Sequence, residues 1–347
     1  MENIDLSIVI PAFNESLIIE KNIDELFSWL GSNLPDFNSE IIVVNDGSTD
    51  KMGDVLEEMK KTRPWLVIAH HKRNFGRGRG VRTGFRNSKG CYVVCMDADL
   101  SYEPAIIARL LKPLIAGDAD IVLASAHHPE GHFTNVPKQR EMLSKWGNNI
   151  LRLGFQQKMH TVTCIVRAFK REVIGCLELV SDGKELHLEI LQKSELMGFH
   201  IMEIPATLEW RDKDRRRSTK KGIMPEIAIF KMRKTVLSHL IFNFVTNPGV
   251  LLFLPLLSLL GVIVATSIML IASLIEKVSI EPSLFLALRQ AFLDGQLTLA
   301  VLLFSAIAFM IFLMFFFLSF QNKRYFDEVY TLMMRMNARI KEMEDRE

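Results

Sequence analysis

Apolar positions along the chain follow two patterns, which meet near residue 240. Before that point, short runs rich in β-branched residues alternate with charged stretches in which apolar residues recur at helical spacing. Helices are predicted at Leu17–Leu30 and Ala105–Ala116, among others. The predicted strands are Leu6–Pro11, Glu40–Asn45, Val67–His70, Cys91–Met96 and Ile121–Ser125. This alternation predicts an α/β domain built on a largely parallel sheet.

The region that follows continues the alternation with less regular spacing. It holds a predicted loop at 127–137, helices at Lys138–Leu153 and Glu185–Met197, and strands near Val162–Phe169, at His200–Ile204 and at Thr207–Trp210. We therefore expect the α/β domain to occupy residues 1–222.

Two long apolar runs come after residue 240, Val250–Ile275 and Leu297–Phe320. Each reaches the ~20 residues that a helix needs to cross a bilayer. Met1–Ser7 is polar and acidic and leads directly into a strand, so no secretion signal is recognisable there. Only Lys277 and Arg289 lie between the runs, whereas basic residues flank their outer ends. We expect an integral membrane protein with two spans and with the α/β domain and both termini in the cytoplasm.

The remaining segments complete the predicted domain organisation. Residues 223–246 mix apolar and basic residues and are expected to form an amphipathic segment at the membrane interface, with an ordinary surface helix as the alternative. Residues 247–321 would form the two-helix anchor and 322–347 a charged helical tail. Small residues such as Ser267 and Ser305 leave a homo-oligomer open as an alternative to a plain anchor.

Charge and cysteine content narrow the classes of partner. The formal net charge of +2 does not favour a nucleic-acid-binding surface. Arg211–Lys221 instead concentrates seven basic residues against two acidic ones close to the predicted membrane, so membrane lipids are expected partners. The four cysteines show no metal-binding spacing and are predicted to be reduced packing residues: Cys91, Cys95, Cys164 and Cys176.

Polar side chains follow three of the predicted strands directly. Asn14, Asp46 and the pair Asp97 and Asp99 would therefore meet at one edge of a parallel sheet, where ligands bind in such folds. Two carboxylates at a strand end can hold Mg²⁺ or Mn²⁺, which would neutralise a leaving diphosphate. Taken alone, each cluster could equally be a turn that only satisfies the backbone.

The order of four motifs is more specific than any one of them. Ile8–Glu15, Val43–Asp50, Asn74–Gly80 and Met96–Leu100 together resemble the family 2 glycosyltransferases of GT-A fold, and the resemblance covers about residues 5–215. It implies a catalytic role for Asp99 and a metal site on Asp97 and Asp99. The nucleotide-sugar-binding residues that it implies are Pro11, Ala12, Asn14, Glu15, Asp46, Gly76, Arg77, Asp97 and Asp99, with Gly76 and Arg77 near the donor phosphates. The alternative for Arg77 is a flexible glycine turn whose arginines face solvent.

Later segments resemble the dolichyl-phosphate mannose synthases and related polyprenyl-phosphate glycosyltransferases within this family. They are Asn135–Arg140, Thr161–Lys170, Glu203–Pro205 and Arg217–Lys220. The resemblance implies that Arg140 binds the acceptor phosphate and contributes to catalysis. Arg217 and Lys220 would assist it, or bind only lipid headgroups, and Arg167 would either join them or form a structural ion pair.

The chain departs from these families at several positions. Asn45 and Ser101 replace commoner acidic and Gln residues, and His127 follows Ala126 where an acceptor-binding Arg is common. His127, His128 and His132 could compensate by binding a metal or, when protonated, phosphate, although loop histidines are often simply solvated. Glu189 matches an acidic position of the family and is either catalytic or a packing anchor.

The resemblance implies inverting transfer of a sugar from GDP-mannose or a UDP-hexose to a polyprenyl or dolichyl phosphate. A glycosyltransferase that extends a polysaccharide or glycolipid is the first alternative, although the Gln-x-x-Arg-Trp motif and additional spans of such enzymes are not found. A catalytically silent membrane scaffold is the second, which the intact Asp97 and Asp99 disfavour.

Overall fold

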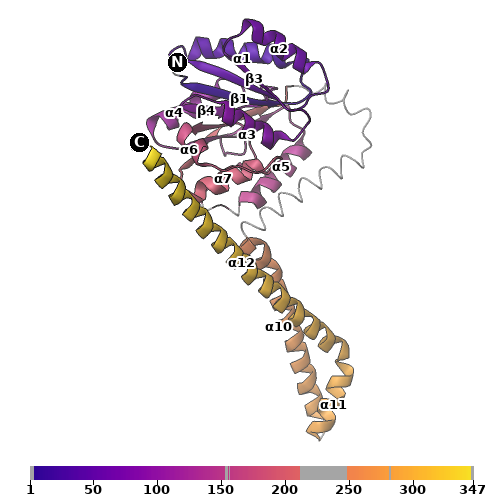
Figure 1. Ribbon diagram of the computed structural model, residues 1–347. Helices are drawn as coiled ribbons and strands as arrows, with labels where there is room; N and C mark the ends of the chain where they lie inside the picture. The colour runs from indigo at the N-terminus through magenta and orange to yellow at the C-terminus, as the bar shows by residue number, and fades with distance from the viewer. Residues whose placement is uncertain (1–3, 153–154, 156, 212–247, 281–282, 345–347) are drawn as a thin grey trace. The chain divides into compact units, whose positions relative to one another are not determined.

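The computed structural model describes residues 4–152, 155, 157–211, 248–280 and 283–344 (Figure 1). The chain divides into two compact units, Met1–Leu240 and Ile241–Glu347, and each is described by itself. The predicted interface segment at 223–246 lies outside the described residues.

A seven-stranded sheet forms the centre of the first unit. β7 runs antiparallel to its neighbours β4 and β5, and the other pairs are parallel. The prediction of a largely parallel sheet is thus confirmed. In spatial order the strands are β3 (Leu66–His70), β2 (Ser39–Asn45), β1 (Leu6–Ala12), β4 (Tyr92–Cys95), β7 (Arg167–Lys170), β5 (Ile121–Ser125) and β8 (Ile201–Pro205).

The register of β1 brings three strand ends together. β1 pairs in parallel with β2 on one side, where Ala12 lies opposite Asn45, and with β4 on the other, where Val9 lies opposite Cys95. The chain thus adds β2 and β3 on one side of β1 and then returns to its other side with β4. Such a change of direction opens a crevice at the carboxyl ends of the strands, which is where ligands bind in this class of sheet.

Helices cover the sheet, which explains why β1 and β2 are largely apolar and buried on both faces. In α4, for example, Ile107, Leu110 and Leu114 are buried at helical spacing, and Gly117 ends the helix in a left-handed conformation. The helices of this unit are α1 (Ile19–Asn33), α2 (Met52–Thr62), α3 (Arg77–Asn87), α4 (Ile106–Ala116), α5 (Lys138–Leu151), α6 (Arg171–Cys176) and α7 (Leu186–Leu196).

One predicted loop contains a strand. β6 (His132–Thr134) lies within the region predicted as a loop at 127–137 and pairs in parallel with β9 (Thr207–Glu209). Three residues are too few to produce a periodic pattern, so the strand exists through its pairing with a distant segment. This small sheet brings the segments on either side of α5 and β8 together.

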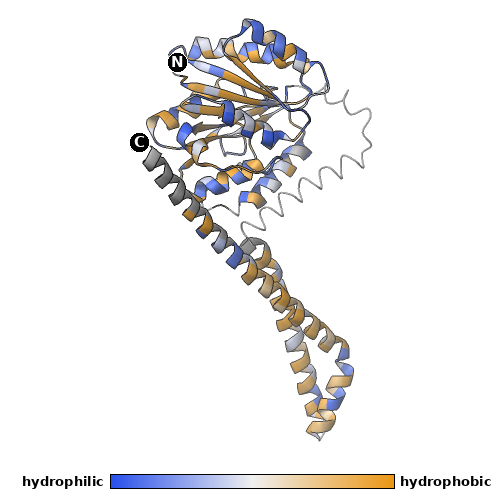
Figure 2. Cartoon of the chain, viewed as in Figure 1, coloured by the Kyte–Doolittle hydropathy of each residue, from blue (hydrophilic) through white to orange (hydrophobic). Residues whose placement is uncertain are grey.

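The second unit is helical, with α10 (Pro248–Ile280), α11 (Leu284–Asp294) and α12 (Gln296–Glu344). Leu252–Ile280 and Gln296–Asn322 are long and apolar enough to cross a membrane, and Figure 2 colours most of their length as hydrophobic. Both candidate spans correspond to the predicted ones within a few residues. α12 continues without a break from the second candidate span to Glu344, so that span and the described part of the predicted tail are one helix.

Candidate active site

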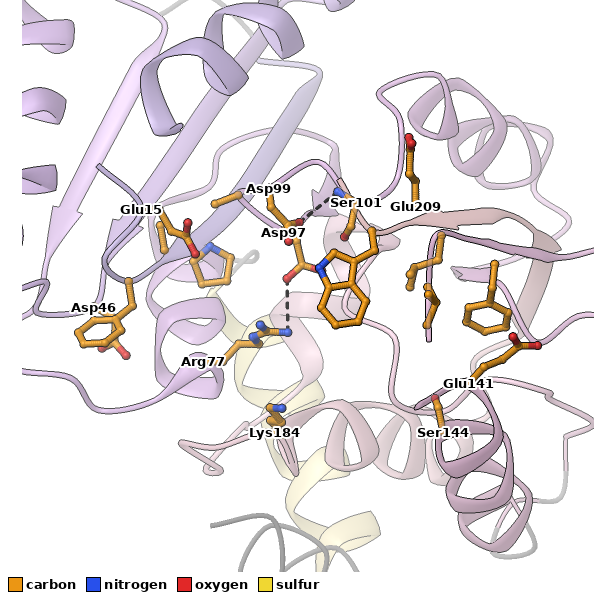
Figure 3. Close-up of a pocket in the computed structure, with 18 of the residues that line it drawn as sticks. Glu15, Asp46, Arg77, Asp97, Asp99, Ser101, Glu141, Ser144, Lys184 and Glu209 are labelled. Carbon is orange, nitrogen blue, oxygen red and sulfur yellow. Dashed lines mark hydrogen bonds and ion pairs between the residues drawn. The ribbon is translucent and has the colours of Figure 1, made fainter. Parts of the chain in front are cut away.

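A cavity of about 680 Å³ lies at the carboxyl ends of β1, β2 and β4 (Figure 3). It extends from Glu15 and Asp46, past Asp97 and Asp99, to Glu141 and Ser144 on α5. The remaining lining residues come from six segments: Pro11, Ala12 and Phe13; Asn74 and Arg77; Ala98 and Ser101; Phe133 and Val136; Lys184; and Leu208, Glu209 and Trp210.

A tight turn places Asp97 and Asp99 on the cavity wall. The amide of Leu100 donates to the Asp97 carbonyl at 3.2 Å, and Leu100 itself adopts a left-handed conformation with φ of 46°. Burial of the Leu100 side chain holds this uncommon conformation in place. The Asp99 carboxylate accepts a hydrogen bond from the Ser101 amide at 3.1 Å. The Arg77 guanidinium approaches the Asp97 carboxylate at 3.3 Å, as Figure 3 shows.

The charge of the cavity wall is strongly acidic. Among the lining residues that the structure describes, two cations, Arg77 and Lys184, accompany six carboxylates: Glu15, Asp46, Asp97, Asp99, Glu141 and Glu209. A diphosphate would be repelled by this excess of negative charge unless a cation accompanied it. The donor set is therefore chemically suited to a hard divalent cation.

The residues present fit a cation of the Mg²⁺ type. Within the described ranges, no group of three or more His, Cys, Asp or Glu side chains forms a closed metal site. Mg²⁺ is commonly held by one or two carboxylates and completes its shell with substrate phosphates and water. Asp97 and Asp99 could supply those carboxylates and leave positions open for a phosphate-bearing ligand.

Asp46 lines the cavity but also organises the loop beside it. One carboxylate oxygen accepts from the Phe75 amide at 3.0 Å and lies 2.7 Å from His71 Nδ1, and the other accepts from the Gly76 amide at 2.8 Å. Gly76 does not line the cavity, so the prediction that it contacts the donor is not supported. Its φ of 110° and its place before Arg77 make it the start of α3.

Asn14 also lies outside the cavity lining. Its side-chain oxygen accepts from the Thr49 amide at 2.8 Å, and its own amide donates to Ser48 Oγ at 3.0 Å. With a left-handed φ of 57°, it joins the loop after β1 to the loop after β2. Direct nucleotide binding by Asn14 is therefore not supported. The other residues predicted on these two loops, Pro11, Ala12, Glu15 and Asp46, do line the cavity.

The surroundings of Arg167 do not support the prediction that it contacts the acceptor phosphate. Arg167 is 1% exposed, and its guanidinium donates to the carbonyls of Cys164, His187 and Val162 at 2.6, 2.9 and 3.0 Å. Burial lowers the pKa of Arg167 to about 10, so the side chain is still charged at neutral pH. No ion pair of Arg167 is found among the described residues either, since the guanidinium donates to backbone carbonyls.

Helix α5 has two faces of different character. Glu141 and Ser144 line the cavity, whereas Met142, Leu143 and Trp146 are 70%, 51% and 64% exposed. Arg140 falls within α5 immediately before Glu141, but its side chain lies outside the described part of the structure, as do Arg217 and Lys220 altogether.

A recess of about 190 Å³ adjoins the main cavity and shares five lining residues with it: Arg77, Asp97, Phe133, Ser144 and Leu208. His127 lines this recess, and its Nε2 lies 3.0 Å from Ser144 Oγ. Burial and then the nearby Lys145 lower the pKa of His127, which favours the neutral imidazole at neutral pH. Phosphate binding by a protonated His127 is therefore disfavoured. His128 and His132 line neither hollow.

Several lining residues were not predicted as site residues. Phe133, Leu208 and Trp210 reach the cavity because β6 pairs with β9. No local sequence pattern predicts this pairing. Lys184 follows Gly183 in a segment without a recognised motif. Its only signal is a basic residue next to a turn-forming Asp-Gly pair, which is too common to indicate a site.

Comparison with known proteins agrees with this geometry. A family model described as glycosyl transferase family 2 matches residues 7–177. Dolichol-phosphate mannosyltransferase of Pyrococcus furiosus is 30% identical over 233 residues, which cover 66% of this chain and 64% of that protein. The chain thus spans slightly less than two thirds of this relative's length. Polyprenol monophosphomannose synthase of Mycolicibacterium smegmatis is 30% identical over 212 residues, which cover 59% of this chain and 77% of that protein.

A solved structure resembles the first unit in fold. Glucosyl-3-phosphoglycerate synthase from Mycobacterium tuberculosis, in complex with Mn²⁺, uridine diphosphate and phosphoglyceric acid, matches with a TM-score of 0.50 at 19% identity and covers 69% of this chain and 78% of its own. The likeness agrees with the GT-A fold that the motifs imply. Because the Mycolicibacterium relative is matched over most of its length, and the family model covers the strands that form the cavity, the chain belongs to glycosyl transferase family 2, in its polyprenyl-phosphate mannosyltransferase-like group.

Proposed function

We propose that the protein transfers a hexose from a nucleotide-sugar, GDP-mannose or a UDP-hexose, to a polyprenyl phosphate with inversion at the anomeric carbon. The observation that carries this proposal is the shape of the cavity, which joins the strand-end carboxylates to a helix with an exposed apolar face. The names of the relatives, a dolichol-phosphate mannosyltransferase and a polyprenol monophosphomannose synthase, support the class of acceptor.

The donor would lie along the strand ends. Pro11, Ala12 and Glu15 are available to the nucleoside at one end, and Arg77 and Lys184 can pair with the diphosphate. Asp97 and Asp99 would hold a divalent cation. When bound, that cation supplies neutralisation of the charge that develops on the leaving diphosphate. The solved relative with Mn²⁺ and uridine diphosphate supports this choice of ligands.

The transfer step would need little proton chemistry. An oxygen of the acceptor phosphate, already anionic, would attack the anomeric carbon while the bond from that carbon to the diphosphate oxygen breaks and the diphosphate carries away the electron pair. Attack opposite the leaving group gives inversion. The residues proposed to hold the acceptor phosphate are Arg140, Arg217 and Lys220.

Removal of divalent cations is expected to weaken nucleotide binding by about tenfold or more, which corresponds to roughly 1.4 kcal/mol. The reason is the excess of carboxylates on the cavity wall, which would repel a diphosphate that has no cation bound to it. Isothermal titration of GDP and UDP into purified protein, with Mn²⁺ and then with EDTA, measures the effect. Equal affinity under both conditions would contradict a cation on Asp97 and Asp99.

The apolar face of α5 is proposed to contact the cytoplasmic leaflet, so that the lipid phosphate reaches the cavity without leaving the membrane. The double substitution Met142→Ser and Trp146→Ser is expected to raise KM for a long-chain polyprenyl phosphate by about tenfold, because interfacial burial of apolar area is lost. KM for a water-soluble short-chain acceptor should stay unchanged. Ile115→Ser, which alters an exposed apolar residue of α4, is the matched control. Equal effects on both acceptors would contradict membrane contact by α5.

The reaction itself is tested with purified protein, polyprenyl phosphate, a divalent cation and a panel of radiolabelled GDP- and UDP-sugars. Label in a mild-acid-labile, organic-extractable lipid is the expected result, and it identifies the donor. If a donor instead builds a longer saccharide and no lipid is labelled, the chain extends a glycan and the proposed acceptor is wrong.

A further inference from the structure

The loop at residues 180–184 is bound to the first turns of α3 through the carboxylate of Asp182. Asp182 accepts two parallel hydrogen bonds from Arg79, from Nε and from Nη2, each at 2.8 Å. It accepts a third from Arg82 Nη1 at 2.9 Å, and its carbonyl accepts from the Arg79 amide at 3.1 Å. A bidentate pair of this kind fixes orientation as well as distance.

Glycines let the two segments approach one another. A Cβ atom at Gly76 would lie 2.6 Å from the Asp182 carbonyl oxygen, and one at Gly78 would lie 2.4 Å from the Gly183 carbonyl oxygen. Both contacts are with backbone atoms, which could not move aside without displacing the loop. Arg77 lies between these two glycines, and its guanidinium extends to Asp97 in the cavity. The loop therefore supports the turn that carries Arg77.

The buried carboxylate of Glu189 holds the start of this loop. Glu189 on α7 accepts from the amides of Val180 and Ser181 at 2.9 and 2.8 Å and pairs with Lys193 at 2.6 Å. Burial opposes the ionised form, but the hydrogen bonds from Lys193, Ser181 and Val180 outweigh it, and the pKa of Glu189 is lowered. Glu189 does not line the cavity, so the packing anchor is the alternative that the structure supports.

We propose that Asp182 is a positioning residue, which fixes Arg77 at the diphosphate side of the cavity by clamping Arg79 and Arg82. Lys184, the other cation among the described lining residues, follows on the same loop, but the clamp is proposed to act through Arg77 alone. The inference rests on the proposed function only in assigning the donor diphosphate to Arg77. The contacts of Asp182 with Arg79 and Arg82 do not depend on which reaction the protein catalyses.

Asp182→Asn tests the clamp, because the amide group turns an NH₂ toward one of the arginine donors and removes the charge. KM for the nucleotide-sugar is expected to rise by about tenfold, while KM for the acceptor changes by less than about twofold. In an Arg77→Gln background the same substitution should add almost nothing, since Asp182 acts through Arg77. A purely structural role would lower the amount of folded protein and leave KM for the donor unchanged.

Hydrogen exchange supplies a readout that needs no substrate. In full-length protein, Asp182→Asn is expected to speed exchange of peptides covering residues 76–82, whose Arg79 amide bonds to the Asp182 carbonyl. Asp120→Asn is the matched control, because Asp120 also pairs with a cation, Lys170 at 2.8 Å, and with a backbone amide, but lies outside the cavity. It should leave exchange in this region unchanged.

The outcomes separate the clamp from the proposed reaction. If the wild-type protein transfers sugar and Asp182→Asn alters neither donor KM nor exchange at 76–82, the clamp is refuted and the function stands. Faster exchange in Asp182→Asn supports the clamp even if the wild-type protein transfers no sugar. In that case the proposed function is wrong and the clamp still stands. An equal loss from Asp182→Asn in the Arg77→Gln background would also overturn the inference, because Asp182 would then act independently of Arg77.

Discussion

Asp99→Ala is expected to lower kcat/KM for sugar transfer at least 100-fold, equivalent to about 2.7 kcal/mol of transition-state stabilisation. Asp99 lies with Asp97 on the cavity wall and accepts only a backbone amide in the described structure. Loss of its carboxylate would remove half of the proposed cation site and leave the developing charge on the diphosphate uncompensated. Initial rates of label transfer to organic-extractable lipid measure the effect.

Two further variants make this result specific. Asp99→Asn keeps the size of the side chain and should be almost as inactive, because a neutral amide is a weak ligand for a hard cation. Asp118→Asn changes an exposed aspartate outside the cavity lining and should retain full activity. An Asp99→Ala protein that kept more than about a tenth of wild-type activity would contradict the cation site, given that metal ligands contribute several kcal/mol.

The sheet could be predicted because its strands carry their own signals. β1 and β2 are buried on both faces, and each therefore contains an uninterrupted run of β-branched residues, Ile8–Ile10 in β1 and Ile41–Val44 in β2. Ile121–Ser125 agrees with β5 residue for residue. The position of Asp97 and Asp99 at a strand end was predictable for the same reason, since it follows from chain order and sheet direction alone.

The contacts of individual site residues could not be predicted in this way. Asn14 and Gly76 occur within recognisable motifs, yet their hydrogen bonds go to Thr49 and Asp46, which are neighbours only in the folded chain. The motif indicates that such residues belong to the site, but not whether they touch a ligand or hold another loop in place. The same limit applies to Asp182, whose partners on α3 lie about one hundred residues earlier in the sequence.

Arg167 shows why burial of a charged residue is especially hard to predict. Its three acceptors are carbonyls of residues 162, 164 and 187. Every residue has a backbone carbonyl, so the amino-acid sequence does not show which of them will accept. A basic residue at the start of a strand instead suggests an exposed position. The guanidinium fits this place because its planar fork can donate to three separate acceptors at once.

Arg167→Ala is expected to lower the free energy of unfolding of the α/β domain by about 3 kcal/mol or more. The substitution would leave three buried carbonyls without this donor and open a void among fully buried neighbours. Removal of the buried charge offsets part of this loss. For a domain of this size the change corresponds to a melting temperature lower by roughly 6–12 °C, measured in detergent without ligand.

Arg167→Lys distinguishes this structural role from acceptor binding. Lysine keeps the charge, but a single ammonium group cannot reach the three carbonyls that the guanidinium joins, so the variant should melt almost as early as Arg167→Ala. Its folded fraction should bind the acceptor with unchanged KM, because Arg167 is buried outside the cavity lining. A Lys variant with wild-type melting and a raised KM for polyprenyl phosphate would reverse this assignment and return Arg167 to the acceptor site.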